Sequence, residues 1–133
     1  MTEEKKRNLE KVLRIWSREY KKGFLTYFIL LMLKEKHMYG LEISEKLKEY
    51  SDNNVTLDGS NIYQILKKLR KLGMVTIKKV SSSKGPTRKY YYIEKNGLKA
   101  LRIFTEEYVY PLHLRLNLEL EEHYPHLFKR SQL

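Results

Sequence analysis

The chain has 133 residues, a size typical of one domain, and 41% of them are hydrophobic, which excludes wholesale disorder. The absence of cysteine excludes disulfides, thiolate nucleophiles and cysteine-based zinc sites. The net charge of +11 is concentrated in residues 58–93, where nine Lys/Arg stand against one Asp/Glu (a net charge of +8), and this clustering favours an anionic partner.

Three helices are predicted in the first half of the chain. Residues 3–22 carry one apolar stripe, and Gly23 is expected to end that helix. Residues 24–35 are apolar nearly all round, which is typical of a buried helix, and their apolar run is too short to cross a bilayer. Residues 39–50 form the third helix, and a polar loop follows. With no signal peptide at its start, the chain is expected in the cytoplasm.

Residues 59–72 form the clearest helix, with Asp58 as its N-cap and Gly73 at its end. Its apolar stripe is expected to enter the core and consists of Ile62, Ile65, Leu66, Leu69 and Leu72. The opposite face is polar and basic, so the sequence predicts one buried and one open side.

Residues 74–80 and 87–93 are rich in Val, Ile, Thr and Tyr, and a polar, basic turn over residues 81–86 separates them. This pattern predicts a β-hairpin. Within it, the three successive tyrosines at 90–92 are interpreted as alternating strand packing.

A last helical pattern begins near Lys95, and Pro111 is expected to interrupt or restart it. The leucines from 112 to 120 alternate, which taken alone suggests a strand. A helix is favoured, because Leu, Glu and Arg are good helix formers and β-branched residues are absent there.

The predicted fold class is therefore mainly α with a small β-hairpin (α+β): a winged helix-turn-helix with extra N- and C-terminal helices that form a dimer interface. Residues 1–23 are assigned to an N-terminal amphipathic helix in the dimer contact. Residues 24–94 are assigned to the winged helix-turn-helix DNA-binding domain, and residues 95–133 to a C-terminal helical dimerisation segment.

Residues 24–101 resemble PadR-type winged-helix regulators. The matching segments are YGLEI at 39–43, GSNIYQILKKL at 59–69, LGMV at 72–75, GPTRKYYY at 85–92 and NG at 96–97. The added N-terminal helix and the Tyr- and Lys-rich composition resemble small archaeal or archaeal-virus regulators. The chain departs from the family at Glu94, where Thr is usual, and in its leucine-rich tail.

A helix in the major groove reads bases with short or amide side chains near its N-terminus, whereas lysines farther along reach phosphates. The resemblance places the tyrosine at position 63 beside the DNA backbone. The residues expected to bind duplex DNA are Ser60, Asn61 and Gln64 as base readers, and Tyr63, Lys67, Lys68, Lys71, Lys84, Arg88 and Lys89 as positioning contacts. Three alternatives stay open: a solvated charged face, a non-specific architectural nucleic-acid binder and a winged-helix protein-interaction module.

The flanking helices offer more apolar surface than this core needs, so a C2 homodimer on an inverted-repeat site is expected. The predicted interface residues are Leu9, Leu13, Trp16, Leu101, Phe104, Tyr108, Leu112 and Leu116. The alternative folds these helices back onto their own subunit. The resemblance also implies a small aromatic effector, for which Trp16, Tyr20, Tyr27 and Phe104 are candidates. The favoured alternative is that these four residues belong to the buried core. His113, His123 and His126 match no standard metal spacing, and neither cofactor nor enzymatic activity is expected.

Overall fold

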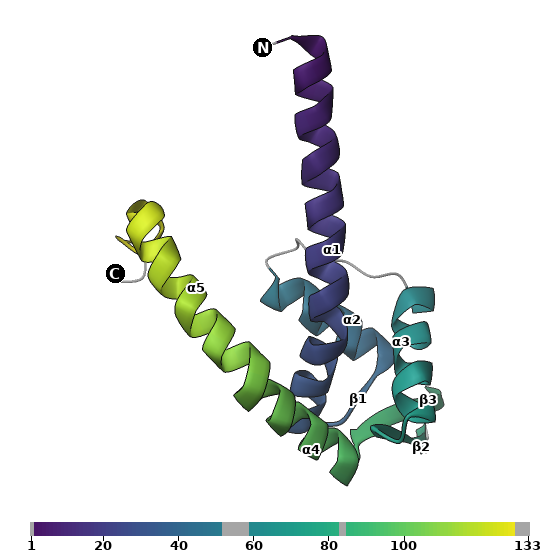
Figure 1. Ribbon diagram of the computed structural model, residues 1–133. Coiled ribbons are helices and arrows are strands. Elements are labelled where there is room, and N and C mark those ends of the chain that lie inside the picture. Colours follow the sequence, from purple (N-terminus) through teal and green to yellow (C-terminus); the bar gives the residue numbers. More distant parts are fainter. Residues whose placement is uncertain (1, 52–58, 83–84, 130–133) are drawn as a thin grey trace. The chain divides into compact units, whose positions relative to one another are not determined.

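The computed structural model describes residues 2–51, 59–82 and 85–129. In chain order the elements are α1 (Glu3–Glu35), β1 (Met38–Tyr39), α2 (Gly40–Tyr50), α3 (Gly59–Lys71), β2 (Val75–Ser82), β3 (Gly85–Ile93), α4 (Lys95–Phe104), a π-helical turn (Thr105–Val109), α5 (Tyr110–His123) and a 3₁₀ turn (Pro125–Leu127) (Figure 1). The chain forms two compact units, Met1–Leu98 and Lys99–Leu133, and each is described by itself.

The prediction that Gly23 ends the first helix is wrong, because α1 is a single helix of 33 residues. Thr2 caps its start by accepting a hydrogen bond from the Lys5 N–H at 3.2 Å, and the helix ends where Lys36 becomes extended. Gly23 costs about 1 kcal/mol relative to alanine, too little to stop a helix flanked by good helix formers. No described helix, α1 included, is long and apolar enough to cross a membrane.

The core of the first unit lies between the second half of α1, α2, α3 and the sheet. Its most deeply buried side chains are Ile29, Met32, Ile43, Leu47, Ile62 and Leu66. Of the stripe predicted on α3, Leu69 is also buried and Ile65 is half-buried. Leu72 is not part of the core, since 61% of it is exposed. The helix ends at Lys71, and Leu72, whose N–H still donates to the Lys68 carbonyl at 3.1 Å, lies at the turn into β2.

The end of α3 is formed by Gly73, as predicted. Its φ of 76° lies in the left-handed region that glycine adopts without a steric penalty. The Gly73 N–H donates to the Arg70 carbonyl at 3.0 Å, and the Met74 N–H donates to the Leu69 carbonyl at 2.9 Å. This pair of hydrogen bonds is a Schellman motif, which satisfies the last carbonyls of the helix and turns the chain into β2.

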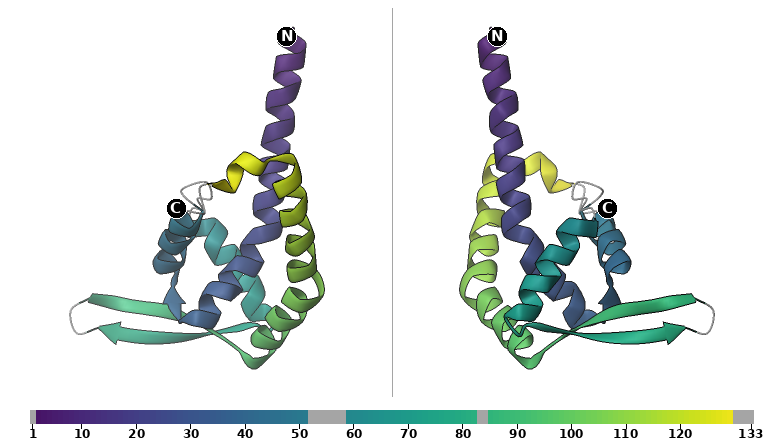
Figure 2. Two further views of the ribbon diagram at one scale, coloured as in Figure 1. Left: turned by 90° about the vertical axis from the view of Figure 1, so that its left-hand side faces the viewer. Right: turned by 90° about the vertical axis from the view of Figure 1, so that its right-hand side faces the viewer.

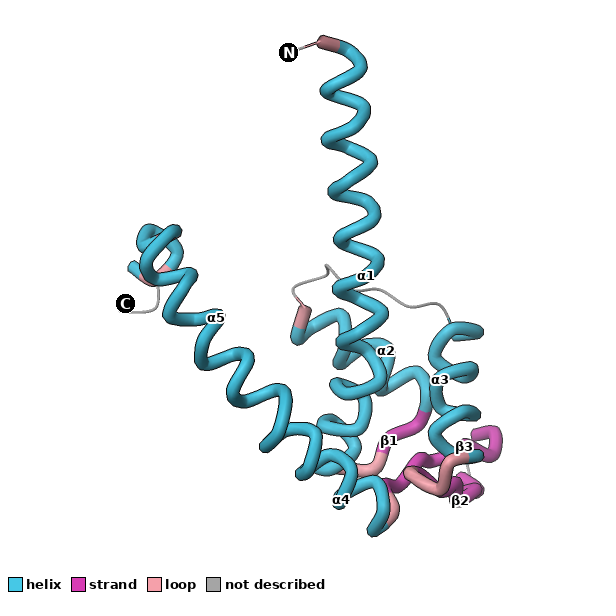
Figure 3. The backbone as a smooth tube through the Cα atoms, viewed as in Figure 1, coloured by secondary structure: helices cyan, strands magenta, loops and turns pink. Residues whose placement is uncertain are grey.

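The predicted hairpin is present, and its strands are longer than expected. A third strand, β1, was not predicted, because two residues are too few to show a pattern. The sheet is antiparallel with the order β1-β3-β2 (Figure 3). Tyr91 lies opposite both Met38 and Ile77 and is buried, whereas Tyr90 and Tyr92 are half-buried, which confirms the alternating packing of the three tyrosines. Burial raises the pKa of the Tyr91 phenol, so it stays neutral. Beyond the body of the first unit the hairpin projects as a wing (Figure 2).

Residues 99–129 are helical almost throughout, and the preference for a helix over a strand at residues 112–120 is confirmed. Pro111 restarts rather than breaks the helix. It lies in the first turn of α5, where its missing N–H costs little. The wider π turn that precedes it, closed by a hydrogen bond from the Tyr110 N–H to the Thr105 carbonyl, makes room for the proline ring.

We expect Gly97→Ala to destabilise the fold. A Cβ atom at this position would overlap the Met74 carbonyl oxygen and lie 2.8 Å from Ile93 Cγ1, so the turn after α3 or the end of β3 must shift. The expected loss in the free energy of unfolding is about 2 kcal/mol, measured by urea denaturation. Gly23→Ala is the matched control, since nothing lies within 4 Å of its added Cβ, and it should stabilise the protein by up to about 1 kcal/mol. Equal destabilisation of both variants would contradict this account.

Candidate nucleic-acid interface

The outer side of α3 is polar and open, as predicted. Asn61, Tyr63, Gln64, Lys67, Lys68 and Lys71 are all exposed. The buried side chains of Ile62, Leu66 and Leu69 hold the other side of the helix against the core. The side chain of Ser60 and the predicted N-cap Asp58 lie outside what the structure describes. We call the six exposed residues the α3 face.

A hollow of about 350 Å³ adjoins the α3 face. It is lined by Tyr39, Gly40, Leu41, Tyr63, Thr87, Arg88 and Lys89, which come from β1, from the start of α2, from α3 and from β3. The fold thus brings together three residues that the sequence predicted as separate positioning contacts: Tyr63 of the helix, and Arg88 and Lys89 of the wing. Lys84, the remaining predicted contact of the wing, lies outside the described residues.

The absence of a side chain at Gly40 shapes this hollow. A Cβ atom there would lie only 2.8 Å from the hydroxyl oxygen of Tyr63 and 3.0 Å from its ring, so glycine lets the ring pack against the start of α2. The hollow therefore combines a phenol hydroxyl and two cationic side chains with the first turn of a helix. The helix dipole favours an anion at such a helix start, where the Glu42 carboxylate of the first turn already accepts a hydrogen bond from the Tyr39 N–H at 3.3 Å.

Aromatic side chains hold Arg88 in place. Its guanidinium carbon lies 4.5 Å from the centroid of the Tyr39 ring, and that ring packs edge-on against Tyr90 at 5.5 Å. A planar guanidinium stacked on a ring keeps its outward N–H groups available for a phosphate. The sequence assigned no role of this kind to Tyr39, because the contact depends on the unpredicted pairing of β1 with β3.

Two further lysines of the wing were not among the predicted residues. Lys79 lies directly opposite Lys89 in the strand register, and both are exposed. Like charges opposite each other destabilise a sheet unless an anion lies between them. Lys78 is also exposed, and its ammonium lies 4.7 Å from the centroid of Tyr92. The signal that could have identified them was their place in the basic hairpin, although adjacent residues of a strand point to opposite faces of the sheet.

Most of the predicted dimer residues are exposed within the chain. The exposed members are Leu9, Leu13, Trp16, Phe104, Tyr108, Leu112 and Leu116. Leu101 differs from them, because only 4% of it is exposed. Of the other α5 leucines, Leu114 and Leu118 are exposed as well and Leu120 is half-buried.

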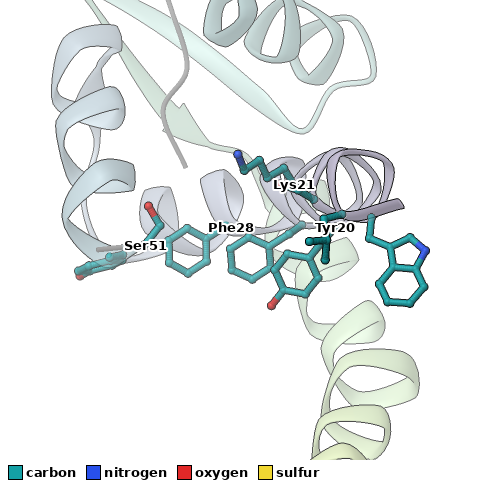
Figure 4. A pocket seen from close by; sticks show the side chains of 9 residues that line it. Tyr20, Lys21, Phe28 and Ser51 are labelled. Atoms are coloured by element: carbon teal, nitrogen blue, oxygen red, sulfur yellow. The ribbon is translucent and has the colours of Figure 1, made fainter. Parts of the chain in front are cut away.

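A second hollow, of about 670 Å³, lies on the apolar side of α1 (Figure 4). Rings stack along its floor, with centroid distances of 5.9 Å for Tyr20–Phe24 and 4.7 Å for Phe24–Phe28, and Tyr50 closes the row edge-on at 5.5 Å from Phe28. Trp16 lines it too, as predicted. Tyr27 and Phe104, the other candidates for an aromatic pocket, do not line this hollow.

Among the described residues, one group has the ligand types and proximity that a metal needs. The possible ligand atoms of Glu119, Glu122 and His123 lie within 4.8 Å of one another on α5. Glu119 already pairs with Arg115 at 2.8 Å and with His123 at 3.5 Å. We therefore assign no metal to it. His113 and His126 do not join this group.

Comparison with known proteins agrees with this architecture. Residues 29–103, which are 75 of the 133 residues, match the model of the transcriptional regulator PadR-like family. A PadR-like transcriptional regulator from Bacillus cereus is 31% identical with a TM-score of 0.64, and the similarity covers 75% of this chain and 95% of the Bacillus cereus chain. A putative transcriptional regulator from Thermoplasma acidophilum is 27% identical with a TM-score of 0.61, and the similarity covers 80% of this chain and 94% of the Thermoplasma chain.

The structure of Bacillus subtilis PadR in complex with operator DNA is also similar, at 27% identity and a TM-score of 0.55. That similarity covers 61% of this chain and 46% of the Bacillus protein, so it concerns the winged-helix part rather than the whole regulator. The family match spans α2, α3 and the wing, and so includes the α3 face and the hollow beside it. The chain belongs to the transcriptional regulator PadR-like family and is not an enzyme.

Proposed function

We propose that the protein is a sequence-specific regulator that binds double-stranded DNA as a homodimer, with α3 in the major groove and the wing on the adjacent minor groove or backbone. The observation that carries the proposal is the α3 face, a polar and basic helix side continuous with a cationic hollow. Bacillus subtilis PadR, which has the same fold, was solved in complex with operator DNA.

Within this proposal the α3 face divides into two kinds of contact. Asn61 and Gln64 lie in the first half of α3, where amide side chains can make paired hydrogen bonds with an adenine edge. Ser60 is proposed to read bases with them. Lys67, Lys68 and Lys71 lie toward the far end and would neutralise phosphates.

The hollow beside α3 is proposed to take a phosphate of the DNA backbone. The Tyr63 hydroxyl can donate a hydrogen bond to it, and the first turn of α2 supplies a favourable dipole. Arg88, stacked on Tyr39, and Lys89 supply the positive charge, and Lys84 is proposed to extend this contact at the wing tip. Contacts of this kind fix the position of the helix in the groove without reading sequence.

We further propose a C2 homodimer, in which a second copy covers the apolar residues of α1 and of the C-terminal helices. In α1, 65% of Trp16 and 53% of Leu13 are exposed. Exposed apolar surface gathered on one helix side is typical of an interaction site rather than of a free surface. Two α3 helices related by a two-fold axis would read half-sites about 10 base pairs apart in an inverted repeat.

The hollow on α1 has a volume and an aromatic lining typical of small-molecule sites, and we propose it as the place for an aromatic effector. The archaeal or archaeal-virus type and the cytoplasmic location stay predictions from the sequence.

Selection of bound duplexes from random DNA tests the proposed function. We expect enrichment of one inverted repeat and, at about 150 mM salt, affinity at least a thousandfold above that for random duplex. Gln64→Ala should relax the enriched sequence at one position of each half-site, whereas Lys67→Ala should weaken binding to all sequences alike. If no sequence is enriched, the proposal of specific binding is wrong.

A further inference from the structure

The part of α1 that precedes the winged-helix body carries a second basic surface. Arg7, Lys11, Arg14, Arg18 and Lys21 follow one another at intervals of four, three, four and three residues. At about 100° per residue they fall within one arc of about 80° on the helix. We call these five residues the α1 basic face.

The apolar side of the same segment lies opposite. Leu9, Val12, Leu13, Trp16 and Tyr20 form an arc whose centre is about 160° from that of the α1 basic face. The segment thus has two chemically different sides rather than one apolar side with a mixed polar remainder.

The α1 basic face is open and uncompensated. Every described residue from 2 to 20 is exposed, and Lys21 is half-buried. No ion pair joins any of the five cations to a carboxylate of the described residues, although Glu3 and Glu10 lie near the edge of the same arc. Arg14, Arg18 and Lys21 line a shallow hollow of about 390 Å³ together with Leu13 and Ser17. Neighbouring cations at helical spacing repel each other, and an anionic partner bound to the α1 basic face would reduce this repulsion.

We propose that the α1 basic face binds phosphates of duplex DNA outside the segment held by α3 and the wing. This inference rests on the proposed function, because it adds a second contact to the same duplex. From residue 7 to residue 21 the helix is about 21 Å long, enough to meet several phosphates of a DNA backbone. In both ribbon views this segment extends beyond the rest of the first unit (Figures 1 and 2). Lysine and arginine at this spacing neutralise phosphates without reading bases.

An anionic membrane surface is the competing partner, because a helix with Lys/Arg on one side and Trp and Leu on the other can also lie in a membrane interface. Binding to a membrane would bury Trp16 and Leu13 in lipid, and these are residues that the proposed homodimer covers. DNA requires the basic side alone and leaves the apolar side for a second copy of the chain.

The test is the salt dependence of binding to random duplexes of about 40 base pairs, roughly four helical turns. The variant is Arg7→Gln, Arg14→Gln, Arg18→Gln, in which glutamine preserves helix propensity. The control removes the same charge at Lys34, Lys36 and Lys99, which are exposed and outside the α1 basic face. The measured quantity is the slope of the logarithm of the binding constant against the logarithm of the salt concentration. We expect this slope to be shallower by about 2 to 5 in the variant than in the control, and binding at about 150 mM salt to be at least tenfold weaker. Circular dichroism should show unchanged helix content.

The outcomes separate this inference from the proposed function. If the wild-type protein binds DNA and the variant keeps the slope of the control, the α1 basic face does not touch DNA, while the role of α3 stands. If the wild-type protein binds no duplex DNA, both fail. Vesicles of phosphatidylserine and phosphatidylcholine should not bind. Vesicle binding that the variant loses, with an unchanged DNA slope, would assign the α1 basic face to membranes instead.

Discussion

Reversing the charge of Lys67, Lys71 and Arg88 to Glu is expected to abolish duplex DNA binding at physiological salt. Each substitution removes a cation from the proposed phosphate contacts and adds an anion that the DNA repels. Loss of three phosphate contacts per protomer alone lowers affinity by orders of magnitude at about 150 mM salt, so we expect a fall of at least a thousandfold. The DNA affinity is measured by fluorescence anisotropy, with a labelled duplex of the sequence selected from random DNA.

These positions make the result interpretable because none of them packs in the core, and Arg88 loses only an exposed contact with the Tyr39 ring that contributes about 0.5 to 1 kcal/mol. All three side chains are exposed, and the side of α3 that packs in the core is formed by other residues. Exposed substitutions of this kind change stability by only about 0.5 kcal/mol. The urea midpoint of the variant should therefore stay close to that of the wild-type protein.

A charge-matched control excludes a general electrostatic effect. Lys34→Glu, Lys36→Glu, Lys99→Glu gives the same change in net charge at exposed positions that belong neither to α3 nor to the wing strands. It should weaken DNA binding by no more than about tenfold through long-range attraction. Equal losses in the two triple variants would show that net charge, rather than the α3 face, governs binding.

The elements that the sequence predicted well are those whose signals are local. The stripe on α3 repeats at helical spacing, Gly73 supplies the backbone conformation that ends the helix, and the sequence SSSKGP at 81–86 is polar between two apolar segments. Such signals act within a few residues, so they need no knowledge of the rest of the fold. The same reasoning failed at Gly23, because a single glycine carries too small a penalty to decide between one long helix and two.

The candidate site was predictable as a set of residues but not as an arrangement. The charge count and the open side of α3 identify the cations. That Gly40 admits the Tyr63 ring, and that Tyr39 carries Arg88, depends on how α2 packs on α3 and on β1 joining the edge of β3. Those contacts join residues that are distant in the sequence, where periodicity holds no information. Glycine and tyrosine at the start of α2 are thus explained by packing, which the sequence alone does not reveal.

Trp16→Glu is expected to dissociate the proposed dimer. The indole is 65% exposed within the chain, on the side of α1 that also carries Leu13 and Tyr20. A tryptophan at the centre of an interface typically contributes at least about 2 kcal/mol, so the dimer should weaken by a factor of about 30 or more, measured by analytical ultracentrifugation over a concentration series. DNA affinity should fall with it, because a monomer binds only one half-site at a time.

The exposure of Trp16 is what makes this test decisive. A side chain with most of its surface in water contributes little to the folding of one chain, so a loss of association cannot be attributed to unfolding. Asn8→Glu adds the same charge to the same exposed helix outside the apolar arc, and should leave the dimer intact. A wild-type chain that is monomeric at micromolar concentration would rule out the dimer. A different outcome is that the protein is a monomer and Trp16→Glu lowers its free energy of unfolding. That result would favour the alternative in which the terminal helices fold back onto their own subunit, and each half-site would then be bound by a separate monomer.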